Sequence, residues 1–269
     1  MSSQASPFQQ PHNWFLVRGL AREAGHWGHF PTQLAQAFPQ GKVICLDLPG
    51  AGVFRAHRTP MSLPAMTRWV REEFKKTLEA QRADGIDPRG ERKNYVLCIS
   101  LGGMVLTEWM RQFDNDWHAA VLVNTSLRGY SPLWRRMQPT ALLQLLRAVV
   151  SRSDEERESR IIRVVVNDIK KRADLLKIWL ELRRARPISI ANSLRQIIAA
   201  ILYRPARPKK LPPILLINSL GDRLAHPSCS ERIARAWDIE TTTHSWAGHD
   251  LTTDDPEWLL QRIQDWKME

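Results

Sequence analysis

The fold is decided by the stretch Tyr95-Val96-Leu97-Cys98-Ile99-Ser100-Leu101-Gly102-Gly103-Met104-Val105-Leu106. An apolar run rich in strand formers ends at Ser100, and the residues after the two glycines have the apolar spacing of a helix. A serine at a sharp bend between a strand and a helix has the geometry of a nucleophile elbow. The bend needs small neighbours because the helix starts close to the strand, and Gly102 meets that need.

Further apolar runs alternate with helical patterns along the chain. Strands are expected at 14–17, 42–46, 119–124, 214–218 and, more weakly, 240–245, and helices at 27–38, 63–80, 101–113, 228–237 and 256–266. Most of these strands are apolar on both faces, which indicates a sheet that is covered by helices on both sides. The sequence therefore predicts an α/β fold with a mostly parallel sheet.

The alternation is interrupted once. Residues 131–205 show only helical patterns, and a Pro- and Lys-rich connector precedes the strand at 214–218. We therefore predict a polar tail over 1–13, a core formed by 14–127 with 211–269, and an inserted helical cap over 128–210.

Length and composition limit the class of protein. A chain of 269 residues with 43% apolar content can bury one sizeable core. No apolar stretch approaches the roughly 20 residues that span a bilayer, and the first ten residues lack the pattern of a secretory signal. The three cysteines cannot all pair, and no Cys/His cluster has zinc spacing. We expect a cytoplasmic protein without a cofactor or metal.

Two loops after strands carry partners for Ser100. Asp222 follows the strand at 214–218, and His249 follows the last strand. Because active groups in such sheets lie beyond the carboxyl ends of the strands, these loops should converge. A serine hydroxyl needs an imidazole to take its proton, and the imidazole needs a carboxylate to fix its tautomer. Ser100, His249 and Asp222 are therefore the candidate catalytic residues, with His244 the nearest rival histidine.

Acyl transfer also requires donors for the developing oxyanion. One candidate is the N–H of Leu101 at the start of the helix after Ser100. The other is the N–H of Leu20, in the loop Arg18-Gly19-Leu20 that follows the first strand.

These motifs together resemble the α/β-hydrolase superfamily, in its compact esterase, thioesterase and lyase branch, over about residues 14–267. The resemblance rests on the loop at 16–20, the segment Asp47-Leu48-Pro49-Gly50-Ala51-Gly52, the elbow at Ser100, Gly221-Asp222 and Gly248-His249-Asp250. It implies a cap over the active site at 128–210. Three positions differ from the usual pattern: Arg18 and Ile99 stand where His is usual, and Cys98 stands where Gly is usual.

Caps of this kind shape the substrate pocket. The candidate lining residues are Gly19 from the core and Trp134, Met137, Leu142, Leu145 and Trp179 from the cap. Most of these cap residues could equally pack the cap helices together or onto the core.

The cap segment also carries the whole excess of positive charge. Residues 128–210 hold 20 Lys and Arg against 7 Asp and Glu. Such a segment attracts anions. Three partners fit: an acidic acyl carrier protein, the phosphates of a coenzyme A thioester, or an anionic membrane surface. A plain solvated cap remains an equal alternative, and no nucleic-acid motif accompanies the charge.

The leading hypothesis is a serine hydrolase that cleaves a carboxylic ester or an acyl thioester through an acyl-enzyme on Ser100. Two alternatives stay open. One is a lyase or carbon–carbon hydrolase in which Ser100 and His249 mainly transfer protons. The other is a non-catalytic member of the fold that binds an acyl group or a carrier protein.

Overall fold

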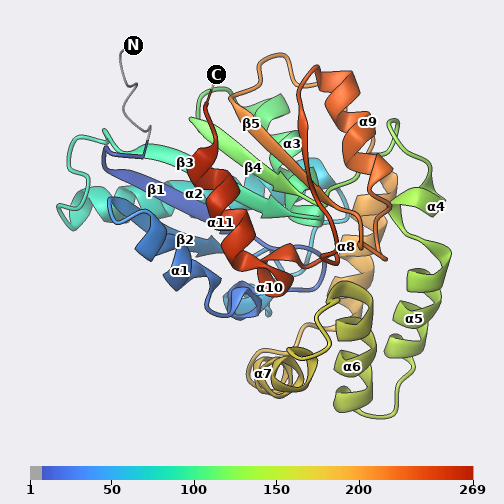
Figure 1. Ribbon diagram of the computed structural model, residues 1–269. Coiled ribbons are helices and arrows are strands. Elements are labelled where there is room, and N and C mark those ends of the chain that lie inside the picture. The colour runs from blue at the N-terminus through green and yellow to red at the C-terminus, as the bar shows by residue number, and fades with distance from the viewer. Residues whose placement is uncertain (1–7, 269) are drawn as a thin grey trace.

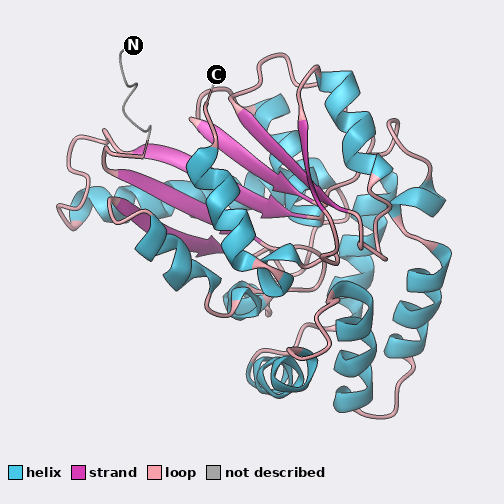
Figure 2. Ribbon diagram, in the orientation of Figure 1, coloured by secondary structure: helices cyan, strands magenta, loops and turns pink. Residues whose placement is uncertain are grey.

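The computed structural model describes residues 8–268, which form a six-stranded parallel sheet in the order β2-β1-β3-β4-β5-β6. The strands are β1 (His12–Val17), β2 (Gly41–Leu46), β3 (Lys93–Ile99), β4 (Ala119–Val123), β5 (Ile214–Ser219) and β6 (Thr241–His244). Figure 2 shows the strands side by side, with helices on both faces of the sheet. The predicted α/β fold is confirmed.

Helices fill the connections between the strands, and two more follow the last strand. They are η1 (Ala24–Trp27), α1 (Phe30–Ala37), η2 (Gly52–Phe54), α2 (Leu63–Ala83), α3 (Leu101–Gln112), α4 (Leu133–Arg136), α5 (Pro139–Val149), α6 (Asp154–Val165), α7 (Arg172–Ala185), α8 (Ile190–Leu202), α9 (Ser228–Trp237), α10 (Leu251–Asp254) and α11 (Pro256–Asp265). No described helix is both long and apolar enough to cross a bilayer.

The central strands feed two separate apolar cores because successive side chains point to opposite faces of the sheet. In β1, Phe15 and Val17 join the cluster under α2, α3 and α9. Trp14 and Leu16 join the cluster under α1 and α11. Figure 1 shows α1 and α11 on the near face of the sheet. Burial on both faces is why these strands read as continuous apolar runs.

Helices α4–α8, in the segment predicted to be a cap, lie between β4 and β5 in the chain and are placed beyond the carboxyl ends of the strands (Figure 1). The cap has a small apolar core of its own, which includes Ala141 of α5, Ile162 of α6 and Trp179 of α7. The end of α8 also joins the main core, where the Tyr203 hydroxyl donates to Glu108 Oε2 at 3.0 Å.

Most element boundaries differ from the sequence prediction by one to three residues, and two of the differences have a clear structural reason. β1 begins at His12 because His12 and Asn13, though polar, are buried and continue the register with β2 and β3. Of the predicted tail, residues 1–7 lie outside the described part of the chain. The helix predicted over 27–38 is divided into η1 and α1, because Gly28 has a positive φ of 55° between them.

The strand order creates the crevice in which the site lies. The chain passes from β1 to β2 on one side and then crosses back to place β3 on the other side of β1. At such a switch point the loops after the two neighbouring strands separate and leave space between them. The loop after β1 carries Gly19, and the loop after β3 carries Ser100.

Candidate active site

Ser100 occupies the bend between β3 and α3 in a strained conformation, with φ 56° and ψ −116°. Its N–H donates to the Val123 carbonyl at 3.0 Å, and its carbonyl accepts from the Thr125 hydroxyl at 2.9 Å. A Cβ on Gly102 would lie 2.5 Å from the Val17 carbonyl oxygen, so only glycine allows α3 to start this close to β1. The tight neighbours hold a backbone geometry that a serine would not adopt alone.

Cys98 stands where the usual pattern has glycine, and its burial in the core accommodates the larger side chain. Its side chain is fully buried in the apolar cluster that also contains Phe15 and Val17. Burial raises the pKa of its thiol well above the ordinary value. Cys98 is therefore a small apolar packing residue.

His249 and Asp222, the predicted base and acid, lie in contact with one another. His249 Nδ1 lies 2.7 Å from Asp222 Oδ2, and both side chains are buried. The other oxygen of Asp222 accepts the backbone N–H groups of Leu224 and Ala225 at 2.8 and 2.9 Å. Because the carboxylate can only accept here, Nδ1 carries the imidazole proton and Nε2 presents its lone pair.

The lone pair of His249 is not used elsewhere. Nε2 is buried and has no hydrogen-bond partner among residues 8–268. His249 and Ser100 line the same cavity, although no hydrogen bond joins the two side chains. Hydrogen bonds of this kind are often long in proteins without substrate.

Four polar residues that sequence reasoning missed hold the loops in place. Asn124, with a positive φ of 49°, donates to the carbonyls of Gly248 and His249 at 3.2 and 3.0 Å. Asp254 accepts the Gly248 N–H at 2.7 Å and the N–H groups of the cap residues Asn167 and Asp168.

The other two residues are Thr125 and Asn167. The Thr125 hydroxyl donates to the Ser100 carbonyl, and the Asn167 side chain donates to the carbonyls of Gly221 and Trp246. The sequence offers one signal for these four residues: Asn124 directly follows a buried strand, at the edge of the sheet where the candidate catalytic loops lie.

His244, the rival histidine, has a structural role. Its Nδ1 accepts the N–H groups of Trp246 and Ala247, and its Nε2 lies 3.1 Å from Asp255. Asp255 also caps α11 through the Trp258 N–H. Both ring nitrogens are thereby engaged away from Ser100.

The loop after β1 lies directly against the elbow. A Cβ on Gly19 would be 3.1 Å from Ser100 Cβ and 3.5 Å from its Oγ. No acceptor within the described chain engages the N–H of Leu20 or of Leu101. Cap helix α8 fixes the loop, because Gln196 Oε1 accepts the N–H of Ala21 at 2.8 Å.

Arg18 pairs with Asp250. The two form a buried, two-point contact at 2.5 and 3.1 Å, and the guanidinium lies 4.7 Å from the Trp27 ring centroid. Burial alone would raise the pKa of Asp250, but the charge of Arg18 and hydrogen bonds from Arg18 and Thr252 outweigh it and lower that pKa. Arg18 therefore carries its charge without leaving a free cation beside the elbow.

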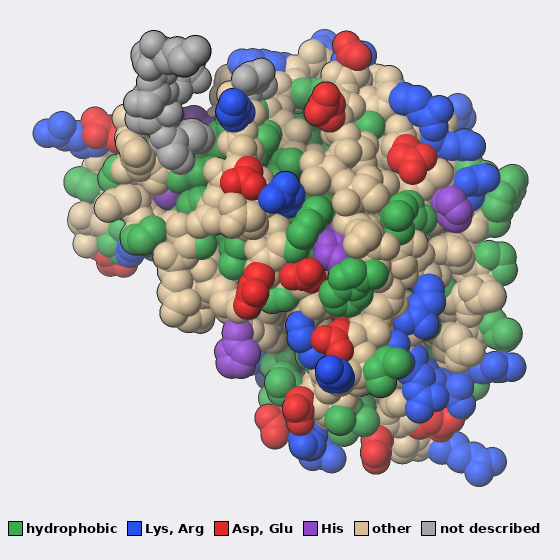
Figure 3. All heavy atoms as spheres, viewed as in Figure 1, with side chains coloured by type: hydrophobic (Ala, Val, Ile, Leu, Met, Phe, Trp, Pro, Cys, Tyr) green, Lys and Arg blue, Asp and Glu red, His purple; other side chains and the backbone are tan. Residues whose placement is uncertain are grey.

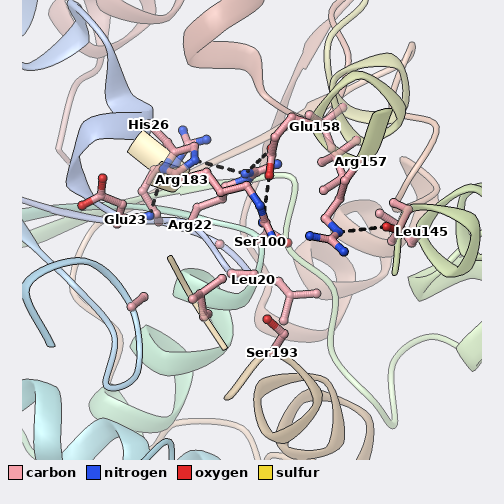
Figure 4. A pocket seen from close by; sticks show the side chains of 18 of the residues that line it. Leu20, Arg22, Glu23, His26, Ser100, Leu145, Arg157, Glu158, Arg183 and Ser193 are labelled. Atoms are coloured by element: carbon pink, nitrogen blue, oxygen red, sulfur yellow. Dashed lines mark hydrogen bonds and ion pairs between the residues drawn. The ribbon is translucent and has the colours of Figure 1, made fainter. Parts of the chain in front are cut away.

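A cavity of about 200 Å³ opens from Ser100 and His249 into the cap. Figure 4 shows the core residues Leu20 and Ser100 facing cap residues across it. Its apolar wall comes from both parts of the chain and includes Leu20, Ile99, Leu145, Ile161, Val165, Leu182 and Ile197. The apolar Ile99 beside the serine is thus part of the wall.

The predicted pocket residues divide into two groups. Gly19 and Leu145 line the cavity. Trp134, Met137, Leu142 and Trp179 do not: Trp134 is 66% exposed, Leu142 is exposed, Met137 is partly buried against the cap core, and Trp179 is fully buried. These positions follow from packing between cap helices, which sequence spacing alone does not fix.

Charged residues close one side of the cavity and join the cap to the core. Arg22 pairs with Glu158 at 3.0 Å, and Glu158 also accepts from Arg183 at 3.2 Å (Figure 4). Arg186 forms a two-point contact with Glu23 at 2.8 and 2.9 Å. Part of the positive charge of the cap is therefore neutralised inside the molecule.

The side chain of His26 lies within this charged cluster. It is buried beside Arg22 and packs against Trp179. Burial, followed by the charges of Arg22 and Arg18, lowers its pKa well below the ordinary value. No group of three or more His, Cys, Asp or Glu side chains among the described residues is arranged to hold a metal ion.

A family model described as "Alpha/beta hydrolase family" matches residues 15–262, and the chain belongs to that family. No protein of curated function matches the sequence.

Solved structures share the fold at low identity. An alpha/beta hydrolase fold protein from Chitinophaga pinensis is 16% identical, with a TM-score of 0.67, 95% of this chain covered and 88% of that chain. A thermophilic esterase from Thermogutta terrifontis is 20% identical, with a TM-score of 0.63, and the match covers 96% of this chain and 89% of that chain. The RedJ thioesterase of the prodiginine biosynthetic pathway in Streptomyces coelicolor is 14% identical, with a TM-score of 0.59, and the match covers 95% of this chain and 86% of that chain. These likenesses concern the fold.

Proposed function

We propose that the protein is a serine hydrolase that cleaves a carboxylic ester or an acyl thioester. The observation that carries the proposal is the contact between His249 Nδ1 and Asp222, which leaves Nε2 without a hydrogen-bond partner among residues 8–268, while His249 and Ser100 line the same cavity. Esterase and thioesterase structures among the similar folds agree with this reaction class.

In the proposed reaction, Ser100 Oγ attacks the carbonyl carbon while His249 Nε2 takes the hydroxyl proton. Asp222 stabilises the imidazolium that forms. The carbonyl oxygen becomes an oxyanion, and the unused N–H groups of Leu20 and Leu101 are its proposed donors. The intermediate then collapses, and the leaving alcohol or thiol takes the proton from His249.

The acyl-enzyme is resolved by water. His249 Nε2 takes a proton from the water, whose oxygen attacks the acyl carbon, and the second intermediate releases a carboxylic acid and returns the proton to Ser100. The apolar cavity wall would hold the acyl or alkyl part of a small-molecule substrate by burying its surface.

A fluorophosphonate probe followed by peptide mass spectrometry tests this proposal. We expect one adduct, on Ser100, that is lost in Ser100→Ala and strongly slowed in His249→Ala. Ser193→Ala is the matched control, because Ser193 lines the same cavity at the cap side. An unlabelled but folded wild-type protein, or equal labelling of the His249 variant, would contradict the proposal.

A panel of esters and acyl thioesters with acyl chains of increasing length then separates the two substrate classes. Turnover of a carbon–carbon substrate without an acyl-enzyme would instead identify the alternative chemistry.

A further inference from the structure

Helix α5 of the cap presents an apolar face to solvent. Leu142, Leu143, Leu146, Val149 and Val150 follow one another at helical spacing along it, and each is between 45% and 77% exposed. On the opposite side, Ala141 and Ala148 pack inward. Isolated exposed leucines are ordinary, but a continuous stripe is not.

Helix α8 has an inverted polarity. Its buried side carries the polar residues Asn192 and Gln196, which bond to core segments near Gly50 and Ala21. Its exposed side carries Ile190, Leu194, Ile198, Ile201 and Leu202, again at helical spacing. A surface helix normally places its apolar side against the core. The outward apolar side of α8 is therefore unexplained by folding.

The two apolar sides border the entrance of the active-site cavity. Val149, Ile190 and Leu194 line the cavity and are also about half exposed. Together with the other exposed residues named on α5 and α8, they form what we call the α5–α8 face. The cavity is thus continuous with an apolar surface at these three residues.

The charges on these two helices have one sign. α5 carries Arg147 and α8 carries Arg195, and neither helix contains an Asp or Glu. Neither arginine has an ion-pair partner among the described residues, unlike Arg183 and Arg186 deeper in the cap. Figure 3 shows hydrophobic and basic side chains intermixed on the side of the molecule where Figure 1 places α4 and α5.

We propose that the α5–α8 face docks on an anionic lipid surface. Such a surface offers apolar depth for the leucines, isoleucines and valines and negative headgroups for the arginines at the same time. A folded acidic protein would match the charges but not this area of aliphatic side chains. Docking does not depend on the bond that the site cleaves. The further idea that the substrate carries a long apolar chain and enters from the lipid rests on the proposed function.

Co-sedimentation with vesicles tests the docking. Ser100→Ala protein is mixed with vesicles of phosphatidylcholine and phosphatidylglycerol in equal parts, or of phosphatidylcholine alone. We expect binding to the anionic vesicles that weakens with added salt. Because this protein cannot form an acyl-enzyme, failure of the proposed hydrolysis leaves the result unaffected.

Two double variants locate the surface. Leu146→Glu with Ile198→Glu should lower vesicle binding at least tenfold, and Arg147→Gln with Arg195→Gln should lower it about thirtyfold on anionic vesicles. The apolar control is Ile169→Glu, which changes a 74% exposed cap residue outside the two helices. The charge control is Arg163→Gln with Arg184→Gln, on exposed positions of α6 and α7.

Three results would overturn the proposal. They are the absence of vesicle binding by the parent protein, binding that survives the Leu146 and Ile198 change, and equal losses in the control variants. The competing occupant of the face is a second copy of the chain. Light scattering without vesicles measures the oligomeric state, and a dimer that Leu146→Glu dissociates would assign the face to that second copy.

Discussion

Arg18 and Asp250 form a buried ion pair that joins the loop after β1 to the loop that carries His249. Arg18 belongs to the segment that lies against Ser100, and Asp250 directly follows His249 in the chain. The pair therefore links the two sides of the site without contacting the serine.

Removing one partner of this pair should be costly. We expect Arg18→Met to lower the free energy of unfolding by about 3–5 kcal/mol, because a buried carboxylate loses its counter-charge. The double variant Arg18→Met with Asp250→Leu should recover part of that loss. Urea unfolding at neutral pH measures both.

The same pair sets a pH dependence. The folded-state pKa of Asp250 is lower than its unfolded value, so its contribution is fully present above about pH 4 and is lost as the pH falls through the folded-state pKa. The difference in stability between wild type and Arg18→Met should therefore shrink in acid. A difference that is constant with pH would refute this assignment.

Asp222→Asn should lower kcat by about four orders of magnitude and leave KM nearly unchanged. An asparagine oxygen can still accept from Leu224 and Ala225, but its NH2 group would face Nδ1 and force the proton onto Nε2. The matched control is Asp255→Asn, because Asp255 contacts the other buried histidine of this region, His244. Comparable losses in both variants would argue against the assigned roles.

Gly19→Ala and Gly102→Ala should separate turnover from stability. A Cβ at 19 would meet Ser100 Cβ at 3.1 Å, so a small shift of the loop should reduce kcat/KM about tenfold with little change in unfolding. A Cβ at 102 would meet backbone oxygen at 2.5 Å and should cost about 1–3 kcal/mol of stability. Steady-state kinetics and urea unfolding on both variants check the distinction, and the reverse pattern would contradict it.

Asp47 should make the protein less stable as the pH rises. Burial raises its pKa to about 6, although the N–H groups of Val53 and Ala24 oppose the shift. Since the folded state holds this proton more tightly than the unfolded state, stability should fall from about pH 4 to about pH 6, by roughly 3 kcal/mol. Asp47→Asn should remove this segment of the unfolding profile.

The control for that profile is Asp174→Asn, on an exposed position of α7. Urea unfolding is compared at several pH values for wild type and both variants. A difference between wild type and Asp47→Asn that does not change between pH 4 and 6 would contradict the assignment.

The sheet, the strand-to-helix bend at Ser100 and the candidate acid and base could be predicted from the sequence. Local signals sufficed there: strands buried on both faces read as apolar runs, Ser100 stands between a strand and a glycine-bearing helix start, and Asp222 and His249 each follow a strand. Because parallel strands end at one edge of the sheet, the order of the residues along the chain is enough to predict that these three lie together.

Contacts between residues that lie far apart in sequence could not be predicted and are seen only in the folded chain. Three features depend on how separate segments pack. Arg18 pairs with Asp250, and Asn124 and Asp254 form hydrogen bonds to the loop that carries His249. The third feature is the apolar side of α8, which faces solvent. The sequence shows that α8 is amphipathic but not which side meets the core. That choice follows from Asn192 and Gln196, whose bonds to core backbone hold the polar side inward.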